Sequence, residues 1–153
     1  MSVTLSTYQN DPAVIRALLM DPGVWVMVGL SDNADRPAHS IARWLTYEQD
    51  RTVIPVHPRA EAVFGQQGYA SLADIPDQDL KVVDCFVNSE HVGAVVDEAI
   101  AHKDRLQLDA IWMQKGVIDH DAAQRAIDAG LEVVMDTCPK IEWLAMESEG
   151  QVR

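Results

Sequence analysis

A glycine, two hydroxyls and an arginine follow the first strongly apolar run of the sequence, and together they could bind a phosphate. The run covers residues 24–28 and stops at Gly29, and Ser31, Arg36 and Ser40 come after it. A proline directly after Arg36 suits the first position of a helix, so the segment predicts a buried strand, a glycine turn and a helix N-terminus. Such an arrangement presents backbone N–H groups to an anion, and hydroxyl and guanidinium groups can complete a diphosphate site. The same pattern also fits the first strand-to-helix turn of any α/β protein, so both interpretations stay open.

A second cation follows the next predicted strand, where many nucleotide-binding sheets carry an acid. His57, Pro58 and Arg59 come directly after residues 52–56, a short β-branched run. An acid at this point binds ribose hydroxyls, whereas an arginine suits a phosphate on or near the ribose, as in NADP or coenzyme A. The dinucleotide fingerprint G-x-G-x-x-G is absent, because no second glycine follows Gly29 at the required spacing. An exposed loop cation is an equally good interpretation of Arg59 taken alone.

The sequence carries none of the common catalytic or metal-binding motifs. G-x-S-x-G, the Walker phosphate loop and HExxH are absent, and the five histidines show no metal-ligand spacing. His91 and His102 are predicted to be solvated helix positions. We therefore assign no catalytic residue and no metal ligand. Cys85 lies inside an apolar run and is predicted to be a core thiol.

Strands and helices alternate along most of the chain, and this alternation must position the residues above. The predicted strands cover residues 24–28, 52–56, 82–87, 110–113 and 131–135. The predicted helices cover residues 12–20, 38–48, 90–102 and 119–129. A helical turn is suggested at 61–64, and a weak tail is expected after residue 140. The pattern predicts an α/β fold: a Rossmann-like doubly wound, mainly parallel sheet flanked by helices in three layers.

Length and charge restrict the domain organisation and the partners. The 153 residues fit a single domain over 1–153, with a core at about 12–143, a flexible N-terminal arm over residues 1–8 and a C-terminal tail. No apolar run approaches the roughly 20 residues of a membrane span, and the N-terminus is no signal peptide, so we expect a cytoplasmic protein. The net charge of -12 argues against nucleic acid and anionic membranes as partners. A bound anion must therefore be held by local groups.

Five short blocks in this order carry a family resemblance. They lie at residues 28–31, 36–40, 53–59, 112–116 and 134–142. Together they resemble the small stand-alone CoA-binding protein family, which is similar to the N-terminal CoA-binding domain of the succinyl-CoA synthetase alpha subunit. The resemblance covers about residues 12–143. Two departures are His57, where the family usually has Asn, and Thr137, where it commonly has Arg.

The resemblance implies a coenzyme A site built from three groups of residues. The diphosphate would be held by Gly29, Leu30, Ser31, Arg36 and Ser40. The adenosine and its 3′-phosphate would be received by His57, Pro58 and Arg59. The pantetheine path would be lined by Val87, Asn88, Trp112 and Gln114.

The function implied is binding of coenzyme A or an acyl-CoA without ligase chemistry. The synthetase subunit has a second domain with a phosphorylated histidine, and an ATP-grasp partner, and we expect neither here. Two alternatives stay open: an accessory module that docks on separate acyl-CoA enzyme subunits, and a NAD(P)-dependent oxidoreductase. The missing glycines and ribose carboxylate count against the oxidoreductase. Self-association into a homo-oligomer also stays open.

Cys138 allows a further hypothesis. It follows the last predicted strand, so its thiol is expected at the ligand edge of the sheet, where it could form a mixed disulfide with coenzyme A. The alternative is that Cys138 packs beneath the tail, covered by Ile141 and Trp143.

Overall fold

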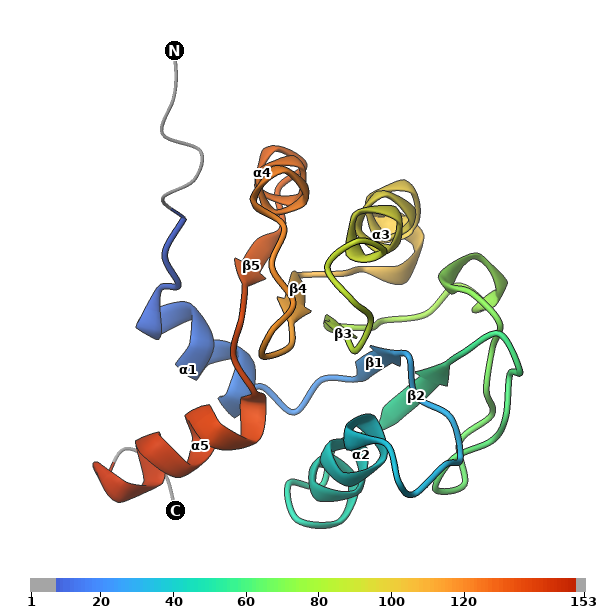
Figure 1. The fold of residues 1–153 in the computed structure, drawn as a ribbon, viewed down its shortest axis with the longest axis horizontal. Helices are drawn as coiled ribbons and strands as arrows, with labels where there is room; N and C mark the ends of the chain where they lie inside the picture. The colour runs from blue at the N-terminus through green and yellow to red at the C-terminus, as the bar shows by residue number, and fades with distance from the viewer. Residues whose placement is uncertain (1–7, 151–153) are drawn as a thin grey trace.

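Five parallel strands form the centre of the computed structural model, which describes residues 8–150 (Figure 1). They are β1 (Trp25–Val28), β2 (Val53–Val56), β3 (Val82–Cys85), β4 (Ala110–Met113) and β5 (Glu132–Val134). Their order in the sheet is β2-β1-β3-β4-β5, and each neighbouring pair is parallel. The five predicted strands are confirmed, each to within a few residues.

Helices cover both faces of the sheet, as the alternating pattern predicted. They are α1 (Pro12–Met20), α2 (Pro37–Tyr47), α3 (Val92–Leu106), α4 (His120–Asp128) and α5 (Pro139–Ser148). One apolar cluster joins α3 and α4 to one face, and a second joins α1, α2 and α5 to the other (Figure 1). The strands are apolar almost throughout because both of their faces are covered. The predicted three-layer, doubly wound α/β fold is therefore confirmed.

Helix boundaries follow local capping chemistry. Asp11 and Asp119 precede α1 and α4, and their side chains accept the N–H groups of Ala13 and Ala122 at 2.9 Å. Gly130 follows α4 with a φ of +93°, the left-handed conformation expected of a C-terminal cap.

The expected weak tail is wrong, because residues 139–148 form α5. Trp143 and Met146 point inward at helical spacing, and the Trp143 ring packs edge-on against Trp44 of α2 at 6.4 Å between ring centres. The sequence pattern is weak because the outer side of α5 also carries apolar residues, Ile141 and Leu144, which are about half exposed.

The start of the described chain is attached to the sheet. The Tyr8 hydroxyl donates to the carbonyl of Val133. The Asn10 side chain bonds both the N–H and the carbonyl of Met135, each at 2.8 Å. The expected loose arm is therefore wrong for residue 8, while residues 1–7 lie outside the described part.

The crossover from β2 to β3, residues 57–81, contains only a short 3-10 turn, η2 (Leu72–Asp74). The helical turn suggested at 61–64 is wrong: Val63 and Gln66 exchange backbone hydrogen bonds across a tight turn in which Phe64 has a φ of 49°.

Arg105 on α3 makes several of the contacts that hold this crossover. The Arg105 guanidinium donates to the carbonyls of Ile75, Leu72 and Ala73 at 2.5, 3.2 and 3.1 Å, and it pairs with Asp77 at 3.1 Å. The planar fork of arginine suits several acceptors at once, so a single residue supplies much of the attachment that a crossover helix would give.

No helix within residues 8–150 is long and apolar enough to cross a membrane.

Candidate functional site

A cavity of about 850 Å³ opens at the carboxyl ends of β1, β2, β3 and β4. From β1 the chain proceeds first to β2 on one side and then to β3 on the other, so β1 and β3 form the switch point of the sheet. Ligands of doubly wound folds bind at this position, and the volume lies within the usual range of ligand pockets.

Most of the residues predicted from the sequence meet at this cavity. The predicted residues that line it are Gly29, Arg36, His57, Pro58, Val87, Asn88 and Gln114. The predicted residues that do not line it are Leu30, Ser31, Ser40, Arg59 and Trp112.

Trp112 lies inside the sheet and not beyond its end. Its ring is fully buried, 5.5 Å from that of Trp25 between ring centres, and its Nε1 donates to the carbonyl of Thr137 at 2.8 Å. The structure therefore makes Trp112 part of the core under α1, α2 and α5, and not of the cavity wall.

The other four residues are near lining residues in the sequence but do not line the cavity themselves. Leu30 and Ser31 are buried, whereas Ser40 is exposed farther along α2. The exposed Arg59 side chain lies 3.6 Å from Glu61, between Arg59 Nε and Glu61 Oε1.

Gly29 allows two strand ends to approach each other. Its N–H donates to the carbonyl of Val56 at 2.8 Å, and its φ is +99°. A Cβ atom here would lie 2.2 Å from the carbonyl oxygen of Phe86, the residue after β3. A side chain at position 29 is therefore excluded by both conformation and space, and the switch point depends on this glycine.

Arg36 introduces positive charge at the start of α2. It has extended backbone angles, and its side chain makes no capping hydrogen bond. Pro37 and Ala38 of the first helical turn also line the cavity. A cation and the positive end of a helix dipole thus act on the same region.

His57 stabilises its own turn while lining the cavity. Its Nδ1 accepts the N–H of Arg59 at 3.2 Å, the bond that an Asn side chain makes to the backbone two residues later. Histidine can therefore make the turn bond of the Asn that the family resemblance leads us to expect at this position. In the neutral ring, the proton is then on Nε2, which can donate to a ligand.

Asn88 and His91 form a second local unit, at the start of α3. The Asn88 Oδ1 accepts the N–H of His91 at 3.0 Å and lies 2.7 Å from its Nδ1. Since a carbonyl oxygen only accepts, Nδ1 carries the proton and the Asn88 amide N–H₂ stays available to a ligand.

The sequence prediction missed three ionisable residues of the cavity. His91 is exposed, as expected, and it also lines the cavity together with Lys115 and Glu98. His91 follows the predicted strand of residues 82–87 by four positions, and Lys115 lies inside the matched block of residues 112–116, so both were close to sequence signals. Glu98 lies in the interior of α3 and gave no such signal.

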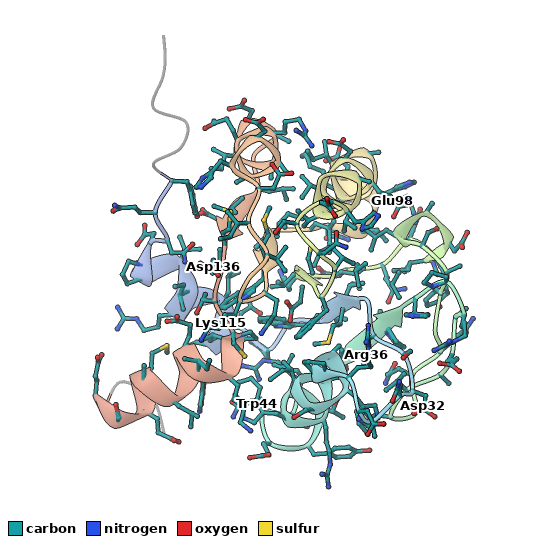
Figure 2. All side chains as sticks on the ribbon, in the orientation of Figure 1. Asp32, Arg36, Trp44, Glu98, Lys115 and Asp136 are labelled. Carbon is teal, nitrogen blue, oxygen red and sulfur yellow. The ribbon has the colours of Figure 1, made fainter. Side chains whose placement is uncertain are left out.

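Hydrogen bonds between loops hold the rim beyond β3, β4 and β5. The Ser89 hydroxyl donates to the carbonyl of Gly116 at 3.2 Å and accepts the N–H of Ile118 at 2.9 Å. Asp136 Oδ1 accepts the N–H of Gly116 at 2.7 Å. Figure 2 labels Lys115 in the loop after β4, Asp136 in the loop after β5 and Arg36 at the start of α2.

Gln114 brings an unused acceptor to the cavity. Its side chain is 9% exposed, and its Oε1 is buried without a hydrogen-bond partner among the described residues. Because a buried acceptor without a partner is costly, this atom is suited to a donor on a ligand.

The two cysteines lie outside the cavity wall. Cys85 is fully buried, as predicted, and burial raises the pKa of its thiol. Cys138 is 6% exposed and precedes α5. This favours the packed alternative for Cys138. Within residues 8–150 no three His, Cys, Asp or Glu side chains are grouped so as to hold a metal ion.

Comparison with known proteins decides the family. The family model described as a CoA binding domain matches residues 23–143. This chain belongs to that family. A curated relative of the CoA-binding domain chain, the uncharacterised protein YneT of Bacillus subtilis, is 30% identical over 131 residues, covering 84% of this chain and 91% of YneT.

Two solved structures are similar to this CoA-binding domain protein over most of their length. A hypothetical protein from Pyrococcus horikoshii has a TM-score of 0.79 at 27% identity, covering 96% of this chain and 98% of its own. A Thermus thermophilus protein, cell-free ID.343, has a TM-score of 0.77 at 28% identity, and the match covers 89% of this chain and 98% of the Thermus chain. Both likenesses support the Rossmann-like fold.

Proposed function

We propose that this protein binds coenzyme A, free or acylated, in the cavity at the β1/β3 switch point. The observation that carries the proposal is the meeting of the Gly29 turn, Arg36 and the first turn of α2 in one cavity of a CoA-binding domain. A diphosphate is the part of coenzyme A that this combination suits, because N–H groups and a guanidinium both favour it.

We assign the other two parts of coenzyme A to opposite ends of the cavity. We assign the adenosine to the side of His57 and Pro58, after β2, and the pantetheine to the side of Asn88 and Gln114, after β3 and β4. The Asn88 amide N–H₂ and the Gln114 Oε1 are a donor and an acceptor, which suits the amide groups of pantetheine. For Arg59 to reach the 3′-phosphate, it must leave Glu61.

The proposal stops at binding. The two thiols of the chain are buried outside the cavity wall, so we assign no residue to covalent chemistry with the ligand.

Isothermal titration with coenzyme A, acetyl-CoA, dephospho-CoA, NAD and NADP tests the proposal. We expect saturable binding of the first two, and weaker binding of NAD and NADP. Arg36→Ala should weaken coenzyme A binding by about ten- to a hundredfold, the usual effect of one charge-assisted contact. Arg43→Ala removes the same charge from an exposed position on α2 and serves as the matched control. No measurable binding of any CoA species, or equal losses in both variants, would overturn the assignment.

A further inference from the structure

Glu98 is unexpected in a cavity proposed to hold a polyanion. It is the one acidic residue among the described residues that line the cavity, whereas Arg36, Lys115, His57 and His91 supply positive or titratable groups. A carboxylate close to phosphates is repelled by them. Glu98 is therefore suited to an uncharged part of the ligand that carries a hydrogen-bond donor.

The position of Glu98 indicates which part that is. Its Oε1 accepts the N–H of Leu72 in η2 at 3.1 Å, which fixes the carboxylate between α3 and the crossover. The preceding residues of the crossover pair with β2: Tyr69 bonds the N–H of His57 through its carbonyl at 3.0 Å and forms a bridge with Val56. Glu98 thus lies on the β2 side of the cavity.

Arg36 and the first turn of α2, which we propose to bind the diphosphate, belong to the opposite face of the sheet from α3. Figure 2 shows Glu98 on α3 and Arg36 at the start of α2, and these helices cover opposite faces. With the diphosphate at Arg36 and the pantetheine toward Gln114, the group left for the β2 side is the nucleoside.

We propose that Glu98 selects the nucleobase, by accepting a hydrogen bond from the 6-amino group of adenine. The inference rests on the proposed function. A carboxylate offers about four lone-pair sites, and the bond from Leu72 uses one of them. A 6-oxo purine presents an acceptor at the same position, so the two oxygens repel each other and the base is rejected. Sites built to bind a particular donor discriminate strongly against analogues that lack it.

The test compares coenzyme A with the analogue in which hypoxanthine replaces adenine, using titration of the whole chain. The wild-type protein should prefer coenzyme A by about ten- to a hundredfold. In Glu98→Gln the amide oxygen can keep the bond from Leu72, while the amide N–H₂ faces the base. This variant should lose the preference or reverse it, because an N–H₂ group suits a 6-oxo purine.

Glu98→Gln removes a negative charge and should therefore strengthen the binding of both ligands. The test of base selection is thus the ratio of the affinities for coenzyme A and for the hypoxanthine analogue. Asp97→Asn is the matched control: it removes an acid from the adjacent position of α3, where Asp97 pairs with Arg125 at 2.9 Å, away from the cavity wall. This control should keep the wild-type ratio.

Two outcomes would overturn the inference while leaving the proposed function intact. One is equal binding of both ligands by the wild-type protein, as expected if Glu98 contacts only ribose hydroxyls. The other is a wild-type preference that Glu98→Gln does not change. Failure of coenzyme A itself to bind the wild-type protein would instead overturn the proposed function.

Discussion

At the scale of single residues, Asp84 is the most unusual group in the sheet. It lies in β3 between Met27 and Trp112, it is fully buried, and neither carboxyl oxygen has a hydrogen-bond partner among the described residues. Burial raises the pKa of this carboxyl well above its ordinary value of 3.8. The folded state therefore binds the proton more tightly than the unfolded state does.

The sign of the pH dependence follows from that shift. The contribution of Asp84 to stability is complete below the unfolded pKa and is lost as the pH rises toward the folded pKa, by up to about 1.4 kcal/mol per pH unit. The Asn side chain of Asp84→Asn cannot titrate, so this variant does not lose stability in this way. We therefore expect the free energy of unfolding of Asp84→Asn, relative to that of the wild type, to increase as the pH rises from about 5 to about 8. Urea unfolding at several pH values measures this, with the exposed Asp35→Asn as control. A pH-independent difference between Asp84→Asn and wild type would contradict the prediction.

Gly29 gives a second prediction at this scale. Gly29→Ala should lower the free energy of unfolding by about 2–4 kcal/mol and abolish coenzyme A binding, because the new Cβ meets the Phe86 carbonyl at 2.2 Å. Gly130→Ala separates the effect of the positive φ from the effect of the clash with Phe86. Gly130 has a similar φ of +93°, but a Cβ added there would meet nothing within 4 Å, so this variant should lose only about 1 kcal/mol and keep its binding unchanged. Thermal unfolding and titration of both variants provide the comparison.

At the scale of elements, the crossover of residues 57–81 depends on Arg105. Arg105→Ala removes bonds to three backbone carbonyls and should lower the free energy of unfolding by about 2–4 kcal/mol. Arg105→Lys should recover little, since an ammonium cannot reach all of these acceptors as a fork does. The exposed pair of Arg125 with Asp97 is the control, and Arg125→Ala should cost less than about 1 kcal/mol. Equal losses for Arg105→Ala and Arg125→Ala would show that the crossover does not need this anchor.

The elements also show what the sequence could and could not predict. Runs such as residues 24–28 identify strands because a strand covered on both faces must be apolar throughout. The outer face of α5 obscured its period, since Ile141 and Leu144 are exposed. At the site, Gly29, His57 and Gln114 were found because they directly follow strands, although Leu30, Ser31 and Arg59 in the same loops do not line the cavity. Glu98 was missed because it lies within α3, away from any strand end. Trp112 was misplaced because it lies one position before the end of β4, where the helices still cover it.

At the scale of the whole molecule, the net charge of -12 opposes the local cations of the cavity. Salt screens the long-range repulsion of a polyanionic ligand as well as its attraction to Arg36 and Lys115. We expect the attraction to dominate, because these groups act at contact distance, so the affinity for coenzyme A should fall as salt rises. Titration from about 0.05 M to about 0.5 M salt measures the slope, with the Arg36→Ala variant expected to show a shallower one. An affinity that rises with salt would show that the global repulsion is the larger effect.

The anchoring of the crossover has a consequence for how this protein can change over evolutionary time. Arg105 bonds the carbonyls of Leu72, Ala73 and Ile75, and Glu98 bonds the N–H of Leu72. These partners are main-chain atoms, which every amino acid except proline provides in full. The exposed side chains of Ala73 and Asp74 can therefore change without loosening the attachment, provided that α3 keeps Arg105 and Glu98. Leu72 and Ile75 are not free to change in this way, because both are buried in the core. Ala70 and Ser71 line the cavity directly before this anchored part, so substitutions there can give new ligand preferences and leave the fold unchanged.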